Sequence, residues 1–289
     1  MQLLPKTLFI AACSIATTGI AAAQEEGSDA SAEGEAPAEA PAEGDGASQA
    51  DAAAPAVSSL TLGKGKILIA GQTLNVNLSS DAVAKPISLA PSIWYGVSDK
   101  LTLGLTHDFG TTPWTPGPTP GLGICLTGAE NGCGDAYSNF GVDGLYGLKA
   151  GKFSLAAHPA LDIGSFDPFL LRLRIGVLGT YAVNDKITIA FDPRIGIGLT
   201  ERDVNKESLD IPVYGWYGIN EKLSAYLATG IGGPLSGFGD SYRIPLGLGG
   251  NYKVSDQLTA GLDFWFMNLL GNGGGADARA LSLRVAYAL

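Results

Sequence analysis

A phrase of eight residues recurs along the chain, and its repetition limits the folds that the chain can adopt. The phrase is YGVSDKLT at residues 95–102, and close copies stand at 181–188, 217–224 and 252–259, with a looser one at 146–154. Each copy joins an aromatic and an aliphatic residue to a short polar turn and a second aliphatic stretch, as two strands joined by a hairpin do. From residue 146 onward the copies lie 35 or 36 residues apart, whereas a longer stretch of 51 residues separates the first two, and the chain ends where the next turn would begin. Six strands that end in these phrases, each preceded by another strand, predict about twelve strands.

The predicted strands alternate between apolar residues and small polar residues. In the stretch 169–183 every second residue from Phe169 is apolar, aromatic or glycine, whereas the other face carries Arg172, Arg174 and Thr180. The stretches 187–199 and 281–289 divide in the same way. Soluble sandwiches, propellers and lipocalin-like barrels also alternate, but a soluble surface is about 25 to 35% charged. Here the polar face is mostly Gly, Ala, Ser and Thr, which is typical of a lumen, so the apolar face is predicted to meet lipid.

Charge and composition divide the chain into three parts. Only 16% of the 289 residues are charged and 46% are hydrophobic, which argues against a cytosolic globular enzyme. The net charge of −10 argues against a nucleic-acid partner. Residues 1–23 predict a signal peptide, and the alternatives are a lipoprotein cleavage at Cys13 and an uncleaved anchor. Residues 24–57 contain nine acidic residues and no basic or aromatic residue, which predicts a disordered linker. Residues 58–289 are the predicted barrel.

The repeated phrases and the alternating C-terminus, LSLRVAYAL at residues 281–289, resemble the Gram-negative outer-membrane β-barrel proteins over roughly residues 64–289. The family most often ends in Phe, whereas this chain ends in Leu289. The resemblance implies an all-β fold, a closed antiparallel up-and-down transmembrane barrel. It also implies insertion by the barrel assembly machinery, contact with outer-membrane lipid and a location in the outer membrane. An even number of strands places both mature termini in the periplasm.

Two sets of residues follow from this arrangement. A tyrosine stands on the apolar face two residues before each turn, which predicts an aromatic girdle at one membrane interface: Tyr95, Tyr146, Tyr181, Tyr217, Tyr252 and Tyr287. The lumen is predicted to carry Arg172, Arg174, Arg194, Arg243, Arg284, Asp162, Asp192, Asp263 and His158, together with Lys253, Asp143 and Asp210. Arg172, Arg174 and Arg194 either form a selectivity strip for anionic or polar solutes or pair with Asp162 and Asp192 to hold the barrel together. Inward aromatic residues either stack on solutes or fill space: Trp94, Tyr214, Trp216, Tyr226 and Trp265.

Two cysteines remain after export, Cys125 and Cys133, and both lie in the long stretch that separates the first two copies of the phrase. Two cysteines in one exported loop predict a disulfide, since a tetrahedral metal site would need two more ligands. The many small inward residues favour an open, narrow lumen, which this proline-rich loop could constrict by folding inward. Only His107 and His158 are available as bases, and neither is predicted to reach a nucleophile, so no catalytic residue, metal site or cofactor is expected.

The sequence therefore favours a passive, porin-like channel for small hydrophilic solutes, with anionic solutes as the finer expectation. The alternative is a non-conducting barrel that serves as a binding or anchoring surface through its extracellular loops and its acidic periplasmic linker. An outer-membrane lipid hydrolase is the least supported function.

Overall fold

The computed structural model describes residues 59–79, 85–107, 111–118, 121–127, 133 and 135–289. The predicted signal peptide and linker lie outside the described residues. The strands are β1 (Ile67–Asn77), β2 (Ile87–Ser98), β3 (Leu101–Thr106), β4 (Gly123–Cys125), β5 (Tyr137–Ser138), β6 (Phe140–Lys149), β7 (Phe153–Ala157), β8 (Ala160–Phe166), β9 (Phe169–Ala182), β10 (Ile187–Phe191), β11 (Arg194–Gly198), β12 (Ser208–Gly218), β13 (Leu223–Pro234), β14 (Leu246–Lys253), β15 (Leu258–Phe266) and β16 (Arg279–Ala288).

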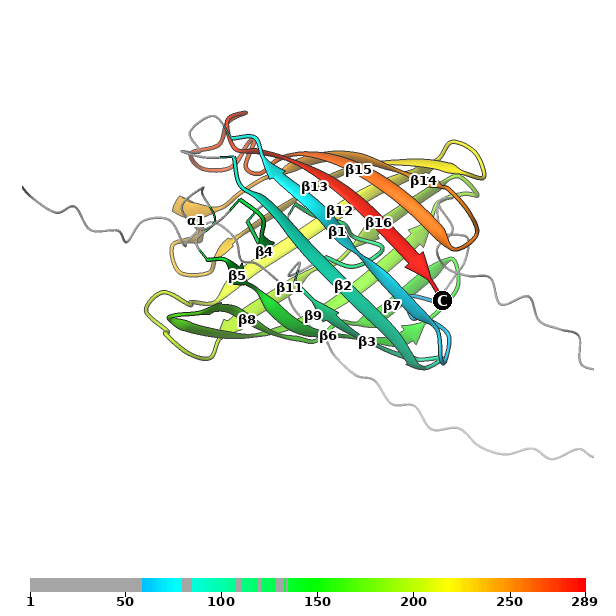
Figure 1. Cartoon of the computed structure of the whole chain (residues 1–289), viewed down its shortest axis with the longest axis horizontal. Helices are drawn as coiled ribbons and strands as arrows, with labels where there is room; N and C mark the ends of the chain where they lie inside the picture. The colour runs from blue at the N-terminus through cyan, green and yellow to red at the C-terminus, as the bar shows by residue number, and fades with distance from the viewer. Residues whose placement is uncertain (1–58, 80–84, 108–110, 119–120, 128–132, 134) are drawn as a thin grey trace, which may run out of the picture.

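These strands form one closed antiparallel barrel. Consecutive strands pair around the ring, and the ring closes because β1 pairs with both β2 and β16. Two crossings of the barrel wall are split in the middle, one into β7 and β8 and the other into β10 and β11, while β4 and β5 belong to a loop. Among the described residues the wall therefore has twelve crossings, and the predicted up-and-down barrel of about twelve strands is confirmed (Figure 1).

The two split crossings lie on either side of β9. The first is interrupted at His158 and Pro159 and the second at Asp192 and Pro193. Proline has no N–H to donate to a neighbouring strand, so each ladder stops there and resumes one or two residues later. The single strand predicted over 187–199 is thus two shorter strands, although its inward and outward faces continue across the break.

The two faces of the wall have the predicted orientation. Apolar side chains such as Ile93, Leu105 and Leu262 are exposed on the outer surface, whereas Ser92, Thr102 and Asp263 on the other face of the same three strands are buried inside the barrel. A closed barrel has no free sheet edge, so its backbone groups are paired and its apolar outer face is suited to lipid.

The two ends of the barrel differ. The tight turns and the C-terminus lie at one end, and the long connections gather at the other with β4, β5 and the one-turn helix α1 (Phe238–Ser241), as Figure 1 shows. Outer-membrane barrels have short periplasmic turns and long extracellular loops, which identifies the two ends. No helix in the described part of the chain is long and apolar enough to span a membrane.

A short hairpin completes the wall near its extracellular end. The strand β3 ends at Thr106, so it does not extend along the first half of β2. There β4 pairs with β2 instead, with Ser88 opposite Cys125 and Leu89 opposite Ile124. The strand β5 pairs with β4, and the ring of Tyr137 stacks on Phe166 of β8 at 5.8 Å. The hairpin therefore bridges β2 and β8 above the short β3.

Candidate functional site in the barrel lumen

The loop after β3 enters the lumen. Thr111, Thr112, Trp114 and Thr115 are buried, and the indole N–H of Trp216, which points inward from β12, donates to the backbone oxygen of Trp114 at 3.3 Å. The hydroxyls of Thr112 and Thr115 lie 2.8 Å apart. The loop therefore folds inward and constricts the lumen, which the sequence had left open.

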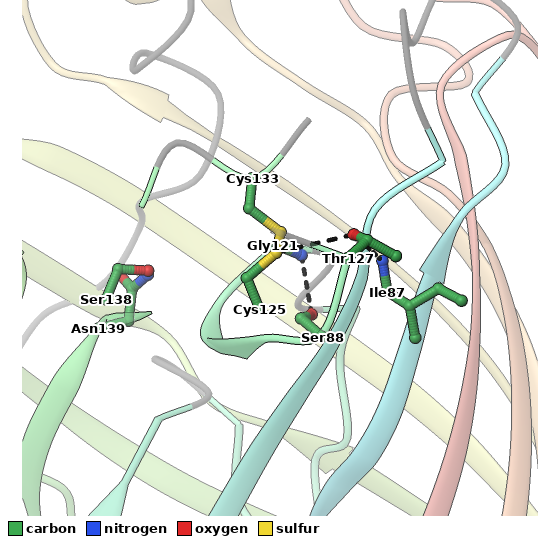
Figure 2. The surroundings of a disulfide bond; sticks show 8 residues. All are labelled: Ile87, Ser88, Gly121, Cys125, Thr127, Cys133, Ser138 and Asn139. Atoms are coloured by element: carbon green, nitrogen blue, oxygen red, sulfur yellow. Dashed lines mark hydrogen bonds between the residues drawn. A yellow bond between two sulfur atoms is a disulfide. The ribbon is translucent and has the colours of Figure 1, made fainter. Parts of the chain in front are cut away.

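A disulfide anchors the far part of this loop at the barrel wall. Cys125 and Cys133 are bonded, as predicted. Figure 2 shows the surrounding hydrogen bonds, in which Gly121 N donates to the hydroxyl of Ser88 at 3.0 Å and Ile87 N donates to that of Thr127 at 3.2 Å. The loop is thus tied to β2 before and after Cys125.

A second segment enters from the periplasmic end. Leu60, Thr61 and Leu62 precede β1 and are 2%, 1% and 7% exposed. They lie inside the barrel because Leu62 N donates to the hydroxyl of Thr102, an inward residue of β3, at 2.8 Å. The lumen is thus occupied from both ends.

The inward histidine lies between two carboxylates at the centre of the wall. His158 Nε2 is 2.9 Å from Asp143 Oδ1 on β6, and His158 Nδ1 is 3.0 Å from Asp192 Oδ1 between β10 and β11. Next to His158, the backbone of β9 accepts a hydrogen bond from His158 N at Gly176 O, at 2.7 Å. Because ionised carboxylates only accept hydrogen bonds, an imidazolium that donates at both nitrogens satisfies both partners.

Two of the predicted lumen arginines extend this cluster. Arg174 forms a two-pronged ion pair with Asp162, through Nε and Oδ2 and through Nη2 and Oδ1 at 2.7 Å. Arg194 Nη2 lies 3.3 Å from Asp192 Oδ2. All four side chains are almost completely buried. Of the two roles considered for these arginines, the geometry fits pairing within the wall.

A second buried cluster lies nearer the periplasmic end. Arg284 pairs with both carboxylate oxygens of Asp263 and donates to Asn251 Oδ1 at 2.8 Å, and the hydroxyl of Tyr226 donates to Asp263. The aromatic rings around it are packed on one another and buried: Tyr214, Trp216, Tyr226 and Trp265. Trp94 is buried in a separate apolar cluster. Such packing fits the filling of space rather than a stacking surface for a solute.

The remaining arginines lie towards the extracellular end and are partly exposed. Arg172 donates through Nε and Nη2 to one neutral oxygen, Asn205 Oδ1, at 3.1 and 2.8 Å. Arg243 pairs with Gly232 through the backbone, and Arg279 Nε donates to the carbonyl of Leu78 at 3.2 Å. No periodic pattern in the sequence pointed to Asn205, because it lies in a loop.

In the loop that carries Asn205, Glu207 is partly exposed. Its own backbone N–H and the guanidinium of Arg202 stabilise the carboxylate, and they lower the pKa of Glu207 below its usual value.

The six tyrosines of the predicted girdle all lie on the outer face, each two residues before a periplasmic turn or the chain end. They are 37 to 50% exposed, and Lys152 lies 5.6 Å over the ring of Tyr181. His107 lies at the other end of the wall, with Nδ1 2.6 Å from the carbonyl oxygen of Pro91 and Nε2 2.8 Å from the hydroxyl of Tyr137.

Comparison with known proteins gives a fold. No protein-family model and no curated relative matches the sequence. Among solved structures, the NanC porin is similar at 9% identity and a TM-score of 0.51, over 75% of this chain and 97% of its own. The KdgM porin is similar at 12% identity and a TM-score of 0.50, over 77% of this chain and 98% of its own. With its closed ring of twelve crossings, apolar outer face and polar interior, the chain has the β-barrel fold of these porins.

Proposed function

We propose that this barrel is a passive channel for small hydrophilic solutes and that it prefers anionic ones. The observation that carries the proposal is the interior itself, a closed wall lined by small polar and charged side chains. Porins of the same fold support it, and one structure of KdgM is of a complex with disordered oligogalacturonate. An anionic solute for this chain is inferred from its own arginines.

The arginines do not contribute equally to this preference. Arg174, Arg194 and Arg284 each face a buried aspartate, so their charge is largely compensated. Arg172 is bonded to a neutral amide and is partly exposed, so its positive charge is the one best placed to attract an anion entering from outside. Asn205 acts as the residue that positions it.

Planar-bilayer recordings of refolded protein test both parts. We expect discrete conductance steps and, in a salt gradient, a reversal potential that favours anions. Arg172→Gln should shift that potential towards cations. Arg202→Gln, which removes an exposed loop arginine paired with Glu207, is the matched control and should leave it unchanged.

Two results would contradict the proposal. If neither the full chain nor a chain without the segment inside the lumen produces steps at any salt or voltage, the barrel is not a channel. If Arg172→Gln conducts with an unchanged reversal potential, Arg172 does not select anions.

The filled lumen favours the second candidate, a non-conducting barrel that binds or anchors through its loops and its acidic linker. Side chains at the centre, including Asp143 and His158, are inaccessible to solvent. The same recordings distinguish the two functions. For a lipid hydrolase there is no support in the described residues, where both histidines bond to groups other than serine.

A further inference from the structure

The segment before the first strand is bound to one hairpin of the barrel. Besides the bond from Leu62 to Thr102, the hydroxyl of Thr61 donates to the backbone oxygen of Asp99 at 2.8 Å. Lys64 N donates to Asp99 Oδ1 at 3.1 Å and Gly65 N donates to the carbonyl of Gly96 at 2.8 Å. All these partners belong to β2, β3 and the turn between them.

The wall leaves room for this segment. A Cβ atom at Gly96 would lie 2.1 Å from the backbone oxygen of Gly63, so only glycine permits the close approach of the two chains. At Gly147 of β6 a Cβ atom would lie 3.6 Å from the side chain of Thr61. The segment is therefore in contact with the wall at two separated strands.

Apolar side chains hold the same segment from inside. Leu60 and Leu62 belong to one buried cluster with inward residues of the wall and with Trp114 of the loop that enters from the extracellular end. The wall residues in this cluster are Leu68, Trp94, Leu145, Ala156 and Leu178. Inward apolar residues are unsuited to a water-filled lumen, but they are suited to a site that holds leucines.

We propose that residues 59–62 are a plug that closes the periplasmic end of the solute pathway and leaves towards the periplasm when the channel opens. The proposal rests on the channel function proposed above. The segment can move without breaking the barrel because β1, the first strand, begins only at Ile67. Inside the lumen the segment binds the β2–β3 hairpin and the apolar cluster around Trp94, and its displacement would break both sets of contacts in one step.

Single-channel recordings of four proteins test the plug. Deletion of residues 24–62 behind the signal peptide should raise the conductance several-fold over that of the full chain. Leu60→Ser/Leu62→Ser should increase the time spent in the open state, since it weakens the buried contacts. Lys64→Ser/Lys66→Ser changes two exposed positions of the same segment and should gate like the full chain.

A reversible lock gives an independent measurement. In a Cys125→Ser/Cys133→Ser background, Thr61→Cys/Gly147→Cys should form a disulfide, because the two side chains would lie within bonding range. Oxidised protein should stay at the closed level at all voltages, and reduction should restore openings. Heat-modifiable migration on gels reports that each variant has folded.

The outcomes separate this proposal from the channel function. If the full chain conducts and the deletion, the leucine variant and the lock leave its conductance and gating unchanged, the plug is wrong and the channel stands. If none of the folded proteins conducts, the channel is wrong and the plug with it. Steps that appear or increase on deletion and disappear on locking support both.

Discussion

At the scale of single residues, His158 stands out because it is buried among charged side chains inside the barrel. It is fully buried between Asp143 and Asp192, and further donors reach the same carboxylates: the hydroxyl of Thr106 donates to Asp143 Oδ2 at 3.0 Å, and that of Thr115 lies 3.4 Å from Asp192 Oδ2. A buried charge is costly unless it is paired and hydrogen-bonded. The imidazole therefore joins three strands of the wall and, through Asp192, the inward loop.

We expect His158→Leu to destabilise the barrel by about 3–5 kcal/mol, because it leaves two buried carboxylates without their shared donor. His158→Gln keeps one amide donor and should cost less. Urea unfolding of the protein in vesicles, followed by the fluorescence of its buried tryptophans, measures both. His107→Leu is the control at the rim of the wall, and a midpoint for His158→Leu equal to that of the unsubstituted protein would show that the cluster does not stabilise the fold.

At the scale of elements, the β4–β5 hairpin depends on more than its own pairing. Among the described residues, two pairs join β4 to β2 and two join β4 to β5, which is little for a stable ladder. The disulfide between Cys125 and Cys133 closes a loop with a sequence separation of eight residues and restricts the unfolded hairpin. The long extracellular loop is therefore held at the wall by a covalent bond where β3 is too short to help.

Cys125→Ser/Cys133→Ser should loosen this hairpin and leave the barrel intact. In the chain-entropy description a loop of this size contributes about 2.5 kcal/mol. Limited digestion with chymotrypsin should then cleave the variant in the long loop well before the unsubstituted protein, while both keep heat-modifiable migration. Equal digestion rates would mean that backbone pairing alone holds the hairpin.

At the scale of the whole molecule, the barrel has an inverted distribution of polarity. Large apolar residues cover the outer surface of the strands, whereas charged pairs and hydroxyls fill the interior. In water such an apolar surface would cause aggregation, but in a bilayer its side chains contact apolar lipid chains. This arrangement fits the outer membrane and explains why the charged residues of the wall pair with one another inside.

A charge placed on the lipid face tests this orientation. Leu262, in the middle of β15, is 52% exposed, and Leu262→Arg should destabilise the barrel in vesicles by about 2–4 kcal/mol. Leu270, in the extracellular connection after β15, is 70% exposed, and Leu270→Arg should change stability little. Equal urea midpoints for the two variants would contradict the assignment of the outer face to lipid.

The architecture could be predicted because its signals are local. The turn phrases and the period of two determined the number of crossings, the inward and outward faces and the outward tyrosines, and two cysteines in one loop indicated the disulfide. The open lumen expected from the many small inward residues was not found, because segment 111–118 folds into it and residues 59–62 occupy its periplasmic end. Those segments have no periodic pattern from which their path could be predicted.

The sequence by itself thus determined a barrel with an apolar outer face and a polar interior, because side chains alternate along each strand and the polar face lacks the charge of a soluble surface. Only the tertiary structure decided which inward charges compensate one another and which remain available to a solute. Asp143, His158 and Asp192 meet because three different crossings of the wall bring them together, and Leu62 reaches Thr102 because the chain turns back before β1. Such contacts depend on register between distant segments, and no single stretch of sequence contains that information.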